Sequence, residues 1–108
     1  MQRIARELNL SETVFLLQPE SGGDARRRIF TPVAELPFAG HPILGTAFFV
    51  GESLGRDEVR LETRKGLVPL QLERSAGRVV FGWMEQPPFP CEPYERAEEL
   101  LAALGVEE

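Results

Sequence analysis

The stretch Glu35-Leu36-Pro37-Phe38-Ala39-Gly40-His41-Pro42-Ile43-Leu44-Gly45-Thr46-Ala47-Phe48-Phe49-Val50 decides the fold. Pro42 suits the first turn of a helix, because its φ is fixed and it has no N–H to leave unpaired. We therefore expect a helix that has His41 as its N-cap and that ends before Gly55, where a left-handed glycine is typical. The run from Ile43 is apolar on nearly every side, which is typical of a buried helix. Such a helix requires a sheet wrapped around it.

Shorter patterns on both sides of this helix predict the strands and the outer helices. Strands are indicated by period-two alternation or by short apolar runs between turn residues, and helices by apolar residues at a spacing of three and four. The prediction is α+β: a mostly antiparallel, curled sheet of three to five strands around a central apolar helix, with amphipathic helices outside. The expected strands are 14–17, 28–31, 59–64, 68–73 and 78–84, the outer helices are 1–8 and 94–104, and 86–93 is a proline-rich connector.

Some residues carry finer structural expectations. Pro69 cannot donate to a strand ladder, so its strand lies at an edge or a bulge there. Gly82 indicates the close approach of another backbone, for which the central helix is the candidate. The strand 78–84 is apolar on both faces, so we expect its outer face to be covered. The triplet 26–28 is read as a solvated loop or an edge guard rather than a phosphate clamp, and Glu35 as a solvated turn residue.

The composition favours one ordinary globular domain. The chain has 108 residues, of which 43% are hydrophobic and 27% charged. The net charge of −5 argues against a nucleic-acid surface and against a polybasic membrane patch. Cys91 is the single cysteine, so no internal disulfide is possible; it is expected to be inert and to fit a reducing compartment. With no signal peptide and no membrane-spanning run, a cytoplasmic protein is expected.

The start of the central helix is the first candidate site. The free N–H groups of Gly40 and His41, with the positive end of the helix dipole, suit an anion such as a carboxylate. The same dipole favours a neutral imidazole at His41, which then donates or accepts a proton near pH 7. The other interpretation, that His41 only caps the helix, stays open at this point.

Glu12 is the second candidate. It lies between Ser11 and Thr13 at the mouth of an apolar strand, where desolvation suits a carboxyl group for general acid–base chemistry. A solvated glutamate at a strand end is the alternative interpretation of the same pattern. The sequence contains no Ser/His/Asp constellation, no metal-ligand spacing and no glycine-rich phosphate loop.

Three segments together resemble the phenazine-biosynthesis isomerase (PhzF-like) family. They are Ile4-Ala5-Arg6-Glu7-Leu8-Asn9-Leu10-Ser11-Glu12-Thr13-Val14-Phe15, then Arg28-Ile29-Phe30-Thr31-Pro32, then Glu35-Leu36-Pro37-Phe38-Ala39-Gly40-His41-Pro42 with Leu44-Gly45 following. The Ser-Glu-Thr and Ala-Gly-His-Pro segments form a specific pair, and the match runs through most of the chain in the family's order.

This resemblance implies a fold of the diaminopimelate-epimerase type and a reaction. The family has two similar domains, each a sheet around a central helix, that close on a small carboxylate-bearing substrate. By position, Glu12 corresponds to the catalytic glutamate and His41 to the active-site histidine, while Gly40 and His41 supply the amides that hold the substrate carboxylate. The implied reaction is an acid–base proton shift on a small cyclic amino-carboxylate, of the trans-2,3-dihydro-3-hydroxyanthranilate type, without metal or organic cofactor.

The resemblance also implies missing parts. Residues 1–108 correspond to a partial first domain, because the family's first strand and whole second domain have no counterpart here. We therefore expect the isolated chain to be inactive or nearly so, and to need a second domain or a further copy. Two alternatives remain: a non-catalytic half-domain that folds with a partner, and an amino-acid epimerase or racemase. The latter is disfavoured, because such enzymes carry a thiol where this chain has Ala39.

Overall fold

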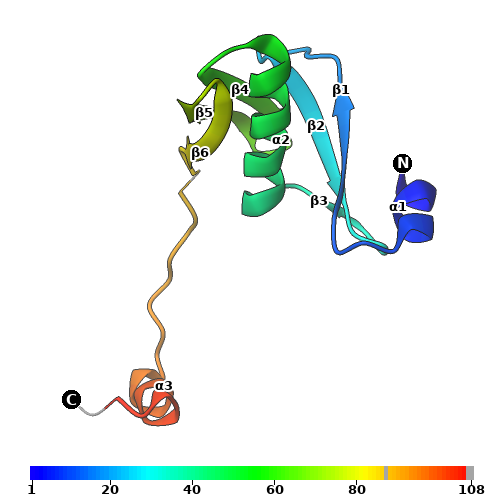
Figure 1. The fold of residues 1–108 in the computed structure, drawn as a ribbon. Coiled ribbons are helices and arrows are strands. Elements are labelled where there is room, and N and C mark those ends of the chain that lie inside the picture. Colours follow the sequence, from blue (N-terminus) through cyan, green and yellow to red (C-terminus); the bar gives the residue numbers. More distant parts are fainter. Residues whose placement is uncertain (87, 107–108) are drawn as a thin grey trace.

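The computed structural model of the protein describes residues 1–86 and 88–106. Within them the chain forms a short helix, a sheet around one long helix, and a terminal helix at the end of an extended segment (Figure 1). The elements are α1 (Gln2–Leu8), β1 (Thr13–Leu17), β2 (Ala25–Phe30), β3 (Glu35–Leu36), α2 (Gly40–Leu54), β4 (Glu58–Thr63), β5 (Gly66–Ser75), β6 (Arg78–Met84) and α3 (Ala97–Leu104).

The sheet has six strands in the described residues and is antiparallel except at one pair. The strand order is β1-β2-β4-β5-β6, with β3 pairing on β2, and β2 and β4 run parallel. Helix α2 provides the crossover between those two parallel strands and packs against β4, β5 and β6. In Figure 1 it crosses in front of the sheet, with β1 and β6 on opposite sides of it. The α+β prediction is confirmed, with one strand more than expected.

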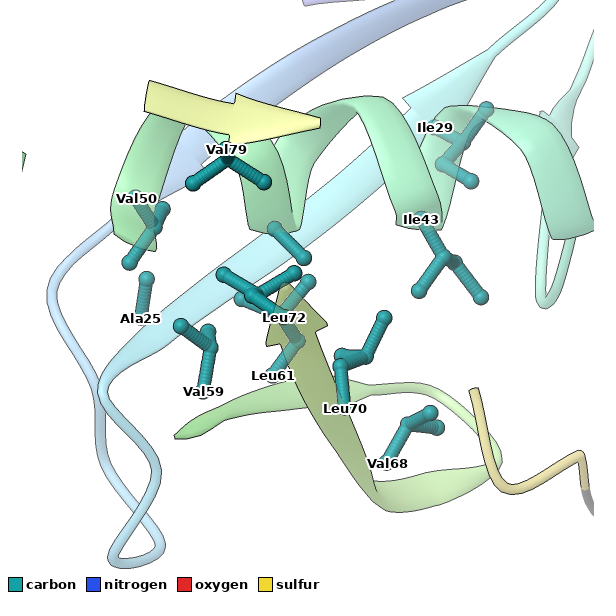
Figure 2. Close-up of a cluster of buried hydrophobic side chains, with 11 residues drawn as sticks. Ala25, Ile29, Ile43, Val50, Val59, Leu61, Val68, Leu70, Leu72 and Val79 are labelled. Atoms are coloured by element: carbon teal, nitrogen blue, oxygen red, sulfur yellow. The ribbon is translucent and has the colours of Figure 1, made fainter. Parts of the chain in front are cut away.

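One apolar cluster holds α2 to the sheet (Figure 2). The helix supplies Ile43, Ala47 and Val50, which are at most 6% exposed. Strands β4 and β5 supply alternate residues, as period-two alternation predicts for one buried face. The cluster consists of Ala25, Ile29, Ile43, Ala47, Val50, Val59, Leu61, Val68, Leu70, Leu72 and Val79.

The ends of α2 agree with the sequence at one terminus and differ at the other. Gly55 is the left-handed C-cap, with φ 65°, as expected. The N-cap, however, is Ala39 and not His41, so the prediction for His41 was wrong. Pro42 lies two residues further into the first turn than expected, at the third helical position, where its missing N–H still removes no intrahelical bond. His41 is therefore free to use its side chain for something other than capping.

The sheet covers only one side of α2. Six of its residues are buried, but Phe49 is 64% exposed and Leu54 49% exposed. Strand β1, expected to be buried, is half-buried, and its Leu16 is 41% exposed. The groove between β1 and the exposed side of α2 therefore remains open in the described residues.

The arginine triplet was assigned wrongly. Residues 26–28 lie inside β2, between β1 and β4, and Arg27 is 2% exposed. Glu35 was also misjudged: its side chain is 13% exposed and accepts two hydrogen bonds from Arg28 and one from Arg64. These paired guanidinium groups, Arg28 first, lower the pKa of Glu35.

Strand β6 departs from simple alternation. The register with β5 shifts between Glu73 and Arg74, which leaves Val80 as the extra residue of a bulge. Val79 and Met84 consequently face α2, while Phe81 and Trp83 are 46% and 62% exposed. The expectation that the outer face of this strand is covered does not hold within residues 1–86 and 88–106.

The expectation for Gly82 is met only in part. A Cβ there would lie 3.0 Å from the Phe48 ring and 3.4 Å from Leu44, so α2 does approach, but through side chains and not through its backbone. Pro69 lies in the part of β5 that precedes its pairing with β6, which begins at Leu70. Beyond that point Glu85 N still donates to Pro69 O at 3.2 Å, so Pro69 lies where the pairing with β6 ends and its missing donor costs little.

The two terminal helices are placed differently: α1 is held at the end of β2, where Gln2 Nε2 donates to Thr31 O, whereas α3 lies away from the sheet (Figure 1). Helix α1 buries Ala5 but leaves Ile4 and Leu8 about half exposed. The connector is extended as predicted where it is described, and α3 begins at Ala97 rather than Tyr94 and buries no residue. Pro87 of the connector and residues 107–108, expected to add no element, lie outside the described residues. Within the described part, no helix combines the length and apolarity needed to cross a membrane.

Candidate active site

Glu12 lies in the short turn between α1 and β1. Helix α1 ends at Asn9, which adopts a left-handed conformation with φ 51° and ψ 37°, a region that asparagine tolerates better than most residues. The chain then reverses through Leu10 and Ser11, so that Glu12 directly precedes the first strand residue, Thr13. The turn thus places the Glu12 side chain at the end of the sheet where α2 begins.

His41 meets Glu12 from the first turn of α2. The distance from His41 Nε2 to Glu12 Oε2 is 3.4 Å. This exceeds the usual range of an N–H···O hydrogen bond, so the two groups are close without being tightly bonded. The Glu12 side chain is 20% exposed and that of His41 is 79% exposed. Two motifs 29 positions apart in the sequence therefore converge, as the resemblance implied.

The Glu12 carboxyl group has an unused acceptor. Oε2 is buried and has no hydrogen-bond partner among the described residues. A buried polar atom without a partner is costly, and such atoms are found where a ligand or a proton supplies the missing interaction. This carboxyl group is therefore available for chemistry rather than committed to the fold.

The start of α2 adds two backbone donors beside this pair. The first intrahelical bond runs from Ile43 N to Ala39 O, at 3.3 Å. Since Pro42 has no N–H, Gly40 and His41 carry the free amides of the first turn. A Cβ on Gly40 would meet only Met84 Cε, at 3.8 Å, so packing does not require a glycine there. The amides and the helix dipole suit a carboxylate.

A cavity of about 450 Å³ opens between β1 and α2 beside these groups. Its polar groups include Glu12 and His41 at one end, and its apolar wall includes Leu16 and Phe49. The Thr46 hydroxyl also lines it but donates to Pro42 O at 2.7 Å, so that donor is already used. A volume of this size is in the range of small-molecule sites.

The sequence did not identify the apolar wall of this cavity. Leu16 and Phe49 were treated as core residues, because an apolar side chain gives no sign of whether another element will cover it. A period-two count places Leu16 on the same face as Val14, which was the available signal. No group of three His, Cys, Asp or Glu side chains able to hold a metal occurs in residues 1–86 and 88–106. Cys91 lies exposed in the connector.

Comparison with known sequences finds close relatives. A family model described as phenazine biosynthesis-like protein (PhzC-PhzF) matches residues 1–108. The trans-2,3-dihydro-3-hydroxyanthranilate isomerase of Pseudomonas aeruginosa is 58% identical over 106 residues, covering 98% of this chain. The enzyme of the same name from Pseudomonas fluorescens is 53% identical over 106 residues, again 98% of this chain. The chain spans 38% of the length of both relatives.

Solved structures give the same grouping. A PhzF family protein from Bacillus anthracis matches with a TM-score of 0.60 and 33% identity, over 69% of this chain and 26% of its own. A protein from Pseudomonas aeruginosa described as a predicted epimerase matches with a TM-score of 0.60 and 38% identity, over 69% of this chain and 28% of its own. Both neighbours support the predicted fold class. The chain therefore belongs to the phenazine biosynthesis-like family.

Proposed function

We propose that residues 1–108 supply one half of the active site of a cofactor-independent isomerase. In this proposal Glu12 is the general acid–base, His41 orients it or relays its proton, and the amides of Gly40 and His41 hold the substrate carboxylate. The substrate is a small cyclic amino-carboxylate of the trans-2,3-dihydro-3-hydroxyanthranilate type, which is the compound named for the two Pseudomonas relatives.

The observation that carries the proposal is the state of the Glu12 carboxyl group. Its Oε2 is buried and without a hydrogen bond, yet it lies 3.4 Å from an imidazole that is open to the cavity. A glutamate that served the fold would have its acceptors filled. The Oε2 atom of Glu12 instead has no hydrogen bond within the described residues, so it can accept a proton.

The proposed step is a proton shift with balanced electrons. The Glu12 carboxylate removes a proton from one ring carbon, and the released electron pair moves into the conjugated double bonds. The double bonds shift along the ring, and a proton returns to a different carbon. Nothing is oxidised or reduced, and Glu12 ends in its starting state. Anchoring the substrate carboxylate at the helix start fixes which ring carbon faces Glu12.

The epimerase alternative lacks its first base. Ala39 is the N-cap of α2 and brings a methyl group to the position where a thiol is needed. The exposed Cys91 cannot replace it, because it lies in the connector after β6. One neighbouring structure is described as an epimerase, but the residues of this chain favour the glutamate-dependent proton shift.

The test replaces Glu12 in a protein that joins this chain to the remaining length of its relatives. Glu12→Gln keeps the shape but removes the base, and general acid–base catalysis is worth about 10²–10⁴-fold. We expect a loss of that size in turnover, with carboxylate binding largely kept. Glu7→Gln, at an exposed position of α1, is the control and should leave turnover unchanged. Turnover retained in Glu12→Gln would contradict the proposal.

The second candidate function is a non-catalytic half-domain that requires a partner. The observation that favours it is the exposure of two large aromatic side chains, Phe49 on α2 (64% exposed) and Trp83 on the outer face of β6 (62% exposed). Large exposed aromatic side chains mark surfaces that other protein covers. Turnover by the joined protein distinguishes the two functions, because a non-catalytic half-domain would not shift a proton even with the remaining length of its relatives attached.

A further inference from the structure

Strand β6 has one edge that no other strand covers. It pairs with β5 and is the last strand of the sheet, so its other side is free within residues 1–86 and 88–106 (Figure 1). Just past the strand, Glu85 N donates to Pro69 O of β5. Because successive residues of an antiparallel strand direct their backbone groups to alternate sides, those of Met84 and Gly82 face away from β5. These two residues therefore present N–H and C=O groups to a further strand.

Only the start of this edge is protected against pairing. Proteins usually protect a free edge with charged side chains, proline or a bulge. At β6 the bulge lies at Val80, and the Glu52 carboxylate accepts a hydrogen bond from Val79 N at 3.3 Å. The remainder of the strand, from Phe81 to Met84, contains no charged residue and no proline. That part of the edge is open to another strand.

Two aromatic side chains lie on the outer face of this open part. Phe81 and Trp83 are 46% and 62% exposed, and their rings meet edge to face with centroids 5.2 Å apart. Trp83 Nε1 donates to Glu73 Oε1 at 3.0 Å, so the polar atom of the indole has a partner while the apolar ring stays uncovered. Exposed aromatic surface beside free backbone groups is typical of a protein interface.

The two ends of the strand carry opposite charges. Arg78 at its start and Glu85 just after its end are both exposed, and neither forms an ion pair among the described residues. The register with β5 and the alternation of side chains place both on the same face as Phe81 and Trp83. A strand with a positive start and a negative end is complementary in charge to a second copy of itself that runs antiparallel.

We propose that β6 pairs antiparallel with β6 of a second copy of this chain, about a two-fold axis at Gly82, and so forms one continuous sheet across a symmetric dimer. Gly82 of each copy exchanges both backbone hydrogen bonds with Gly82 of the other. Phe81 then lies opposite Trp83 of the second copy, in a pair of the type that brings side chains closest together. At each end of the paired strands, Arg78 of one copy approaches Glu85 of the other. Because the interface is two-fold symmetric, each of these side-chain contacts occurs twice.

Analytical ultracentrifugation of the 108-residue chain, from micromolar to millimolar concentration, tests the dimer. We expect a reversible equilibrium between monomer and dimer, because one strand pair with its aromatic contacts makes a small interface. Phe81→Lys combined with Trp83→Lys places positive charges opposite each other and should leave only monomer. Val33→Lys is the matched control, at an apolar residue that is 82% exposed between β2 and β3, and should dimerise like the unmodified chain.

Charge reversal tests the antiparallel register. Arg78→Glu alone, or Glu85→Arg alone, brings like charges together at both ends of the paired strands and should raise the Kd of the dimer roughly tenfold. The double variant, Arg78→Glu with Glu85→Arg, restores opposite charges and should return the Kd to that of the unmodified chain. Both side chains are exposed, so these variants are expected to fold.

Hydrogen exchange of the backbone amides gives a second readout at the edge itself. On dilution the Gly82 and Met84 amides should lose protection, while the Trp83 amide, which faces β5, should keep it. Strand β6 contributes no residue to the cavity beside Glu12 and His41, so this outcome does not depend on the proposed function.

Three results would overturn the proposal. The first is a chain that stays monomeric at millimolar concentration. The second is a dimer that persists when Phe81 and Trp83 are both replaced by lysine, since another surface would then hold it together. The third is a double charge reversal that fails to restore the dimer.

Discussion

Glu12 and Glu62 are two carboxyl groups in similar positions with opposite states. Each lies at the end of a strand beside a turn, and each is largely shielded from solvent. Glu62 accepts hydrogen bonds from the backbone amides of Glu20, Ser21 and Gly23, and the first of these is the largest cause of its lowered pKa. In the part of the chain that the structure describes, Glu12 has a buried oxygen with no hydrogen-bond partner, and an imidazole lies 3.4 Å from it.

The difference separates a structural carboxylate from one that is free to react. The hydrogen bonds that Glu62 accepts join the loop between β1 and β2 to the end of β4. These hydrogen bonds would break if the Glu62 carboxylate moved. Within residues 1–86 and 88–106, Glu12 Oε2 has no hydrogen-bond partner, and the imidazole of His41 lies 3.4 Å from it. The same side chain thus serves the fold in one region and remains available for proton transfer in the other, and its hydrogen-bond partners decide which.

The strongest test at the Glu12 end removes one donor of the carboxylate site without disturbing the helix. Gly40 is the first residue of α2, where proline is tolerated, and Ala39 before it is extended (φ −155°, ψ 129°), as a residue before proline must be. Gly40→Pro deletes one of the two amides that we propose bind the substrate carboxylate. A hydrogen bond to a charged group is worth about 1.5–3 kcal/mol, or roughly 10–100-fold in Kd.

Calorimetric titration with anthranilate measures this loss, and the Tm reports whether the fold is kept. The amides of the Glu62 loop should be unaffected. Unchanged affinity for anthranilate in Gly40→Pro would show that the start of α2 does not bind the carboxylate. No group would then be known to position the substrate beside Glu12.

The corresponding test at the Glu62 end is Gly23→Ala. A Cβ on Gly23 would lie 2.6 Å from Glu62 Cγ and 3.0 Å from Arg60 O, so either the loop or the carboxylate must shift. Overpacking of this kind costs about 1–3 kcal/mol, which urea unfolding would detect. Gly45→Ala is the control, because nothing lies within 4 Å of its Cβ. In a helix that change should stabilise by about 0.5–1 kcal/mol. Equal free energies of unfolding for Gly23→Ala and the unmodified chain would show that the hydrogen bonds to Glu62 do not fix the position of this loop.

The smallest effect is a change in the pH dependence of stability. Since hydrogen bonds from backbone amides lower the pKa of Glu62 below its value of 4.5 in the unfolded chain, its contribution is present above that pH. The contribution is lost as the pH falls through the lower, folded pKa. Glu62→Gln should therefore be less stable than the unmodified chain at pH 6, and the difference should shrink in acid. Parallel curves from pH 6 to pH 3 would contradict this assignment.

What the sequence could predict was local. The proline and glycine residues around α2 fix its ends within one or two residues, and the alternation in β4 and β5 fixes their buried faces. The states of Arg27 and Glu35 depend on partners from other strands, which no local pattern contains. Sequence alone therefore assigned both residues to solvent, whereas the structure buries Arg27 and leaves the Glu35 side chain only 13% exposed.

The candidate site was foreseen only in part. Spacing alone indicated an anion site at Gly40 and His41, but the pairing of Glu12 with His41 came from the family resemblance, because it joins a turn before β1 to a helix that follows β3. The apolar wall at Leu16 and Phe49 was missed. Whether an apolar residue lines a cavity or the core depends on which elements cover it, and that is a property of the whole sheet.

The central claim is that the site around Glu12 can bind a ligand, whereas the Glu62 carboxylate is fully occupied by hydrogen bonds from the loop between β1 and β2. The most direct measurement is an amide ¹H–¹⁵N spectrum of the 108-residue chain during titration with anthranilate. The account predicts that the amides of Gly40 and His41 move while those of Glu20, Ser21 and Gly23 stay in place. Movement of the loop amides without Gly40 and His41, or no movement at all in a dispersed spectrum, would contradict it.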